Sequence, residues 1–186
     1  MFDEIQRFRT FNKLKSVYRY SSVDDRKESS AEHTWSALVL ADLFLEQGTY
    51  NLNRLKVYEL LLYHDAVEII TGDRPLHPDI PQEEKTRQET LAAQKLSTRI
   101  PESLKEKYLA LHNEYVARRT PEAKFAKAID VLDAQIHELD YKEDWEGYTR
   151  EFLVNQKGHI FDEFPELKKS FHEVLDYCEK HGYFSQ

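Results

Sequence analysis

The sequence predicts an all-α protein that folds as a single domain over residues 1–186. Apolar residues recur with the 3.6-residue period of a helix along most of the chain. Residues that break helices are few, with 5 Gly and 6 Pro, and most of them fall between the periodic stretches. The length suits one ordinary domain, and 40% apolar residues, with 11 Tyr and 10 Phe, are enough for one large core.

We expect about seven to nine helices around a buried central helix, and no segment has the pattern of a strand. Helix starts are marked at Ser29, which forms a capping box with Glu32, at Pro101 and at Thr120-Pro121. A metal-site core should occupy about 29–142, with C-terminal helices over 144–181. The expected helices span about 2–15, 30–47, 53–70, 81–99, 102–118, 121–142, 144–155 and 163–181.

The stretch 53–70 should be the central helix, because its apolar residues cover almost all sides of a helical wheel. It ends at Thr71-Gly72-Asp73. The segment 74–81 that follows contains three prolines and is expected to be an irregular loop.

Charge and cysteine content limit the classes of function. The chain has 34 acidic and 26 basic residues, a net charge of -8, which disfavours nucleic acid as a partner. The first twenty residues carry charges every few positions, so they form neither a signal sequence nor a membrane span. The single cysteine, Cys178, fits a reducing cytosol, and we expect a cytoplasmic protein without membrane contact. A small phosphorylated ligand remains compatible with this charge, because a bound cation reverses the local field.

The most informative motif is YHDAVEIITGD, which puts His64, Asp65 and Glu68 in the most hydrophobic stretch of the chain. An unpaired buried charge costs several kcal/mol, so a carboxylate there needs a cation or many hydrogen-bond donors. On a helix, Glu68 lies four residues after His64 and three after Asp65, so the three side chains share one side. A His-Asp pair alone is usually held by ordinary hydrogen bonds, and a metal site requires further ligands.

Further ligand candidates lie on two other predicted helices. His33 points inward, and Asp130 and Asp133 flank the apolar stripe of the helix that starts at Pro121. Periodicity alone slightly favours Asp133 over Asp130. Two imidazoles with two carboxylates suit one divalent transition metal ion, such as Co, Mn, Fe, Ni or Zn, and are too rich in nitrogen for Mg or Ca. The lack of cysteine ligands argues against a structural zinc.

Three motifs together resemble the 5'-deoxynucleotidase branch of the HD-domain metal-dependent phosphohydrolases. They are ESSAEH (28–33), HDAVEIITGD (64–73) and KAIDVLD (127–133), and the likeness covers roughly residues 1–155. The resemblance implies hydrolysis of deoxynucleoside 5'-monophosphates to nucleoside and phosphate, with a nucleotide as substrate and a homodimer as the common assembly.

The resemblance also implies roles for individual residues. It selects Asp130, not Asp133, as the fourth ligand, and makes Glu68 the group that handles the attacking water. Asp73 matches the residue that meets the sugar hydroxyl. Arg19 and Tyr20 are the nearest match to an arginine and aromatic pair that contacts phosphate and deoxyribose, although the spacing to His33 is shifted and a tryptophan is the usual aromatic residue. The implied metal ligands are His33, His64, Asp65 and Asp130.

Other functions are less well matched. Hydrolases of ppGpp tend to carry Glu-Asp after the HD pair, whereas Ile69 follows Glu68 here. Cyclic-dinucleotide phosphodiesterases need additional histidines, and neither His77 nor His137 has the required spacing. Triphosphohydrolases are usually longer and more basic. A non-catalytic helical interaction module is the alternative from another class, but it has no reason to keep Glu68 beside a full ligand set.

Overall fold

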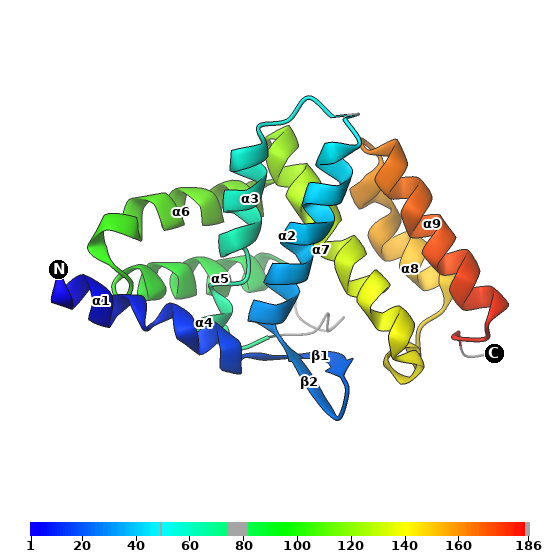
Figure 1. The fold of residues 1–186 in the computed structure, drawn as a ribbon, viewed down its shortest axis with the longest axis horizontal. Coiled ribbons are helices and arrows are strands. Elements are labelled where there is room, and N and C mark those ends of the chain that lie inside the picture. Colours follow the sequence, from blue (N-terminus) through cyan, green and yellow to red (C-terminus); the bar gives the residue numbers. More distant parts are fainter. Residues whose placement is uncertain (49, 74–81, 185–186) are drawn as a thin grey trace.

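The computed structural model of the chain describes residues 1–48, 50–73 and 82–184, without the side chains of 82–86, so the expected loop at 74–81 lies outside the described residues. The predicted all-α class is confirmed: helices dominate, and one small hairpin accompanies them (Figure 1). The α-helices are α1 (Phe2–Phe8), α2 (Ser30–Glu46), α3 (Arg54–Tyr63), α4 (Glu68–Thr71), α5 (Gln82–Ser97), α6 (Glu102–Ala117), α7 (Pro121–His137), α8 (Arg150–Lys157) and α9 (Pro165–Lys180). Short 3₁₀ helices span Phe11–Ser16, Glu138–Asp140, Lys142–Trp145 and Gly158–Phe161.

The predicted helix starts of α2 and α7 are confirmed by their capping hydrogen bonds. Ser29 accepts a hydrogen bond from the backbone N–H of Glu32, and the Glu32 side chain accepts from the backbone N–H of Ser29. Thr120 caps α7 through the N–H of Ala123, with Pro121 at the first helical position. These bonds satisfy N–H groups that have no partner within the helix, which fixes where α2 and α7 begin.

The most buried helix is α7 and not the stretch 53–70 that the sequence favoured. Along α7, Phe125, Ile129 and Leu132 are all completely buried, and the helix packs against α2, α3, α6 and α9. Helix α3 buries one face but leaves Leu55 and Leu62 more than half exposed. In Figure 1, α7 runs behind α2 and α3 through the middle of the molecule. Because α7 is central, the acidic residues on its inner edge lie near the core.

The expected helix over 53–70 is interrupted after Tyr63. The backbone hydrogen bonds there join residues three positions apart, as in a 3₁₀ helix. The N–H of Ala66 donates to the carbonyl of Tyr63, and the N–H of Glu68 donates to the carbonyl of Asp65. The short helix α4 then begins at Glu68. The motif that carries His64 and Asp65 therefore lies in a turn between α3 and α4, not within a continuous helix.

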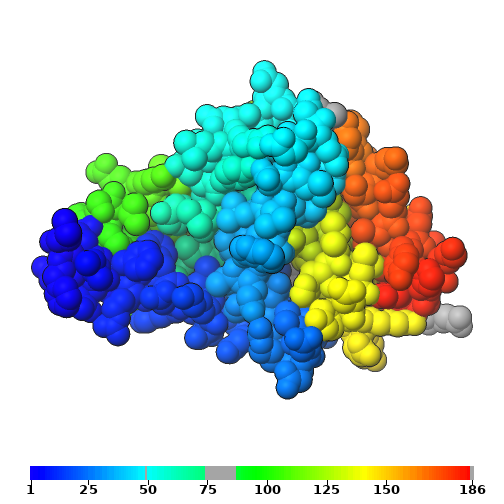
Figure 2. Space-filling model, in the orientation of Figure 1, coloured from blue at the N-terminus to red at the C-terminus, as the bar shows by residue number. Residues whose placement is uncertain are grey.

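A β-hairpin forms where the sequence predicted no strand. Strand β1 (Tyr18–Val23) pairs antiparallel with β2 (Arg26–Ser29), and the register is irregular between Tyr18 and Ser22. Most of its residues are polar, so the hairpin lacks the alternating apolar pattern that reveals a strand. β2 leads directly into α2, and Figure 2 shows the hairpin against the segment that follows α7.

The first helix and the expected helix over 144–155 differ from the expected boundaries. The expected helix 2–15 ends at Phe8 as α1, which has no buried residue, and continues as the 3₁₀ helix. The expected helix 144–155 is divided into a 3₁₀ helix and α8, while α9 matches the stretch 163–181 closely. Helix α9 packs on α7. In the described part of the chain, no helix has the length and apolar character needed to cross a membrane.

Candidate metal centre

Three separate elements bring the predicted ligands together in the interior. His33 lies on α2, Asp130 on α7, and the pair His64-Asp65 in the turn between α3 and α4. His33 is fully buried, and His64 and Asp130 are 5% and 8% exposed. Three residues far apart in sequence therefore meet at one buried point because the three helices pack on one another.

The distances between donor atoms suit one metal ion. His33 Nε2 lies 3.0 Å from Asp130 Oδ1, and His64 Nε2 lies 3.7 Å from the same oxygen. Donor atoms bound to one transition metal at about 2.0–2.2 Å lie roughly 3 to 4 Å apart. Among the described residues, His33, His64 and Asp130 form the group whose ligand atoms all lie within 4.8 Å of one another.

Asp65, the fourth predicted ligand, lies at the edge of this group. Its Oδ1 is 3.2 Å from His64 Nε2, while its other oxygen, Oδ2, is 4.0 Å from His33 Nε2. Oδ2 also accepts a hydrogen bond of 3.3 Å from Arg19. The structure therefore brings three predicted ligands together and leaves Asp65 shared between them and an arginine.

The hydrogen bonds of His64 indicate that a cation belongs in the site. Its Nδ1 donates to the carbonyl of Leu61 at 2.6 Å, so in the neutral ring the Nε2 atom carries a lone pair. That nitrogen is buried and makes no hydrogen bond, although carboxylate oxygens of Asp65 and Asp130 face it. A lone pair facing two carboxylates is unfavourable unless a positive ion lies between them. The residues present therefore fit a divalent ion.

Asp133 has a different position from Asp130 and lies outside the group of described residues whose ligand atoms converge. Asp133 Oδ2 lies 2.9 Å from His33 Nδ1 and accepts a second hydrogen bond from Ser36 at 2.6 Å. It therefore holds the far side of the His33 ring and turns Nε2 toward Asp130. Burial lowers the pKa of His33, but the hydrogen bonds to Asp130 and Asp133 outweigh it and raise that pKa to about 10. This point of the core accordingly favours positive charge.

The second oxygen of Asp130 is held by two donors that the sequence did not reveal. Tyr115 Oη and Lys127 Nζ both donate to Oδ2 at 2.6 Å, which leaves Oδ1 directed toward the two imidazoles. Burial opposes ionisation of Asp130, but Lys127 and the neighbouring histidines outweigh it and keep the pKa of Asp130 well below its usual range. Lys127 stood in the KAIDVLD motif one turn before Asp130, and that spacing was the available signal.

Glu68 begins α4 beside the metal group. Its carboxylate accepts a hydrogen bond of 2.6 Å from the hydroxyl of Ser30. Burial, together with the negative charge of Asp65, raises the pKa of Glu68 to about 8. A divalent cation next to Asp65 would offset that charge and bring the pKa of Glu68 closer to neutrality. Such a carboxylate has the position and basicity to exchange a proton with water at physiological pH.

Arg19 lies inside the site. Its side chain is 14% exposed and forms ion pairs with Glu28 at 3.2 Å and with Asp65 at 3.3 Å. A guanidinium group paired with two carboxylates is firmly oriented.

Tyr20 and Asp73 have different surroundings. Tyr20 is 52% exposed, with its ring under the ammonium group of Lys27, whereas Arg19 points inward, as expected for neighbours on a strand. Burial raises the pKa of Asp73, and the positive charge of Arg19 opposes that shift. Gly72 directs Asp73 back to the hairpin with φ +69° and ψ +167°, a conformation almost restricted to glycine.

The hairpin that carries Arg19 is fixed to the segment after α7. The backbone N–H and the hydroxyl of Ser22 both donate to Asp144, at 2.6 and 2.9 Å. The ring of His137 donates to the carbonyl of Ser22 at 2.7 Å, and Ser21 donates to Glu138 at 3.0 Å. These contacts hold β1 against the end of the helix that provides Asp130.

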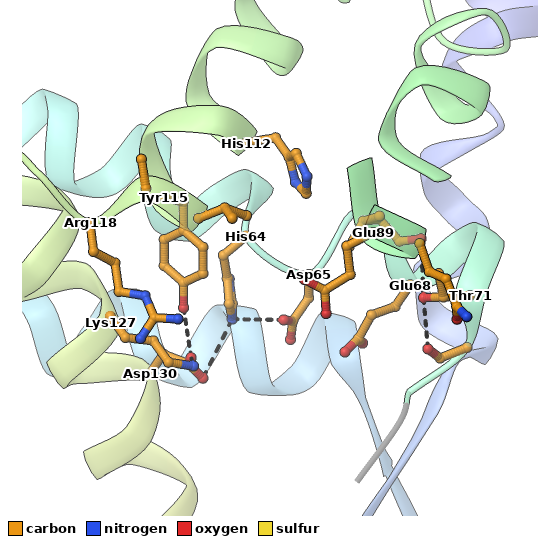
Figure 3. A pocket seen from close by; sticks show the side chains of 15 residues that line it. His64, Asp65, Glu68, Thr71, Glu89, His112, Tyr115, Arg118, Lys127 and Asp130 are labelled. Carbon is orange, nitrogen blue, oxygen red and sulfur yellow. Dashed lines mark hydrogen bonds and ion pairs between the residues drawn. The ribbon is translucent and has the colours of Figure 1, made fainter. Parts of the chain in front are cut away.

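A cavity of about 530 Å³ opens beside the metal group (Figure 3). His64, Asp65, Glu68 and Asp130 form part of its wall, and the side chains of α6 form another part. Arg19, Tyr20 and Asp73 are not among its lining residues. A cavity of this size accommodates a small organic ligand in contact with the ion site.

Comparison with known proteins gives the class to which this fold and site correspond. Residues 11–168 match the HD domain family, and the chain therefore belongs to that family.

The relatives within this family include named 5'-deoxynucleotidases. The human protein named 5'-deoxynucleotidase HDDC2 is 32% identical over 75% of this chain and 68% of its own length. The Escherichia coli protein named 5'-deoxynucleotidase YfbR is 31% identical over 91% of this chain and 93% of its own length. A crystal structure from Magnetospirillum magnetotacticum, described as a predicted metal-dependent phosphohydrolase, is 28% identical with a TM-score of 0.87, and covers 100% of this chain and 95% of that one. The predicted resemblance to HD-domain phosphohydrolases and their 5'-deoxynucleotidase branch is thus confirmed.

The anchoring of the hairpin gives a testable prediction for Asp144→Ala. This change removes the acceptor of two Ser22 donors and should reduce the free energy of unfolding by about 1–3 kcal/mol. Amide hydrogens of β1 should exchange faster, while those of α9 should change little. Urea denaturation and hydrogen-exchange mass spectrometry measure the two effects.

Asp140→Ala is the matched control, because Asp140 is exposed and its side chain forms no hydrogen bond or ion pair with the described residues. Its effect should stay within about 0.5 kcal/mol. Unchanged exchange in β1 after Asp144→Ala would show that Asp144 does not anchor the hairpin.

Proposed function

We propose that the chain hydrolyses 2'-deoxynucleoside 5'-monophosphates to deoxynucleoside and inorganic phosphate. The observation that carries the proposal is the convergence of His33, His64 and Asp130 beside the partly buried carboxylate of Glu68. The names of the relatives support the substrate class. One divalent transition metal ion would be held by these three residues together with Asp65.

Glu68 would perform the proton transfer. A divalent ion in this site supplies a Lewis acid for the phosphoryl oxygen and lowers the pKa of water. Glu68 orients the attacking water and accepts its proton, and a well-placed base of this kind contributes roughly 10² to 10⁴ in rate. The hydrogen bond from Ser30 holds the carboxylate in position, and a divalent ion beside Asp65 would lower the raised pKa of Glu68 toward neutrality, so that its carboxylate form can accept a proton.

Arg19 and Asp73 would bind the substrate on the hairpin side of the site. Arg19 presents a cation close to Asp65, where the phosphate would lie, although the protein as a whole is acidic. Asp73 would accept a hydrogen bond from a sugar hydroxyl. Because Tyr20 is exposed, we assign discrimination against ribose chiefly to the surroundings of Asp73, which include Arg19.

A substrate panel tests the proposal. Phosphate release should be measured with deoxynucleoside and ribonucleoside monophosphates, nucleoside triphosphates and ppGpp, in the presence of Co, Mn, Mg or Zn. We expect turnover of the deoxynucleoside monophosphates, with dAMP preferred over AMP by about 10-fold or more. Turnover of triphosphates or ppGpp alone would refute the proposed substrate class, and no turnover with any metal would favour an interaction module.

We also propose that the chain forms a homodimer through an exposed apolar stripe on α2. Trp35, Val39 and Leu43 are spaced four residues apart, so they lie on one face, and each is more than half exposed. A stripe along one straight helix is self-complementary, because a twofold axis brings the same helix of a second copy against it. A stripe of this kind is a frequent sign of a protein interface.

Val39→Lys tests the dimer, since a buried ammonium group at the middle of the stripe would oppose association. Sedimentation of the unmodified chain should give twice the monomer mass of 22.1 kDa, and Val39→Lys should give the monomer mass. Leu91→Lys on α5, where Leu91 is 55% exposed, should remain a dimer. A monomeric unmodified chain, or a dimer that survives Val39→Lys, would contradict this interface.

A further inference from the structure

His112 is a buried polar side chain that the chemistry proposed above does not use. It lies on α6, is 3% exposed, and neither ring nitrogen has a hydrogen-bond partner in the part of the chain that the structure describes. Buried polar atoms in proteins almost always have at least one partner. Burial lowers the pKa of His112, so the ring is neutral and offers one donor and one acceptor.

The ring of His112 faces the cavity beside the metal group. Figure 3 shows it extending from α6 into the space between His64 and Glu89. Arg118 and Lys127 lie near Asp130 at another part of the wall, separated from His112 by Tyr115. The cavity therefore has a charged part near the ion site, and His112 adds a neutral polar group to another part of the wall, between His64 and Glu89.

Several other polar groups of the wall are already engaged with protein atoms. Asp130 accepts from Tyr115 and Lys127, and Glu68 accepts from Ser30. Apolar side chains also line the cavity, and they include Val67, Val116 and Ala117. A ligand group that fits here is flat and apolar on its faces and carries hydrogen-bonding atoms on its edge.

We propose that His112 recognises the nucleobase of the substrate through a hydrogen bond to the edge of the base. The assignment rests on the proposed function, since it takes the occupant to be a nucleotide whose phosphate lies at the ion site. Every nucleobase presents both donors and acceptors on its edge, which a neutral imidazole can match from either nitrogen. His112 is thus a specificity residue that distinguishes base-bearing from abasic sugar phosphates.

The test compares two substrates on His112→Phe, which keeps a flat ring and removes both hydrogen-bonding atoms. The full-length, metal-loaded variant should lose about tenfold or more in kcat/KM for dAMP. For the abasic analogue 1,2-dideoxyribose 5-phosphate, kcat/KM should stay within about twofold of the unmodified chain. The thermal unfolding temperature should not fall, because no internal hydrogen bond is lost.

Tyr108→Phe is the matched control. Tyr108 lies one helical turn before His112, and its buried hydroxyl also has no partner among the described residues, but it does not line the cavity. Its removal should change neither substrate. An equal loss of kcat/KM for both substrates after His112→Phe would overturn the assignment. No loss of kcat/KM for dAMP would also overturn it, and would show that only water bonds to the ring of His112.

Binding of deoxyadenosine separates this proposal from the proposed function, because it requires no turnover. Calorimetry should show binding to the unmodified chain that weakens about tenfold in His112→Phe and is unchanged in Tyr108→Phe. If no nucleotide is hydrolysed but this pattern holds, the proposed reaction fails and the role of His112 stands. If deoxyadenosine does not bind, or binds equally to His112→Phe, the role of His112 is refuted whatever the outcome of the substrate panel.

Discussion

The structure depends on placing several carboxylates around two buried imidazoles at the turn between α3 and α4. Each of these groups would be costly to bury alone, and a second carboxylate nearby increases that cost. His64 illustrates the constraint most clearly, because its unpartnered Nε2 faces oxygens of Asp65 and Asp130. A divalent cation would satisfy all of these groups at once. Asp133 orients the ring of His33, and Lys127 holds the second oxygen of Asp130.

The fold supports this arrangement by giving each role to a different element. α7, the most buried helix, carries Asp130 and Asp133 three residues apart, so that one faces the ion site and the other orients His33. The hairpin contributes Arg19. Hydrogen bonds between the hairpin and Asp144 hold the guanidinium group of Arg19 beside Asp65. α6 contributes the wall of the cavity with Tyr115 and His112. Packed helices thus position the candidate ion site, and the hairpin places an arginine beside it.

Local signals in the sequence predicted the helical class, the capped starts at Ser29 and Thr120, and the inward direction of His33. The hairpin could not be predicted, because its polar residues are held by partners about 115 to 122 positions away, such as Asp144 and His137. Periodicity could not separate Asp130 from Asp133 either, since both lie on the inner edge of α7 and only the packing of α2 decides which faces the second imidazole. The unpartnered ring nitrogens of His112 could not be predicted from the sequence either, because burial without a hydrogen-bond partner is a property of the packed structure.

We propose that one ion is held by His33, His64, Asp65 and Asp130, and that Glu68 lies beside this ion without binding it. Elemental analysis of the purified chain and of two variants distinguishes these roles. We expect about one transition metal ion per chain in the unmodified protein and in Glu68→Gln, and a large loss of metal in His33→Ala, which removes one of few ligands. Loss of metal in Glu68→Gln to the same extent as in His33→Ala would make Glu68 a ligand, and full metal content in His33→Ala would refute the proposed site.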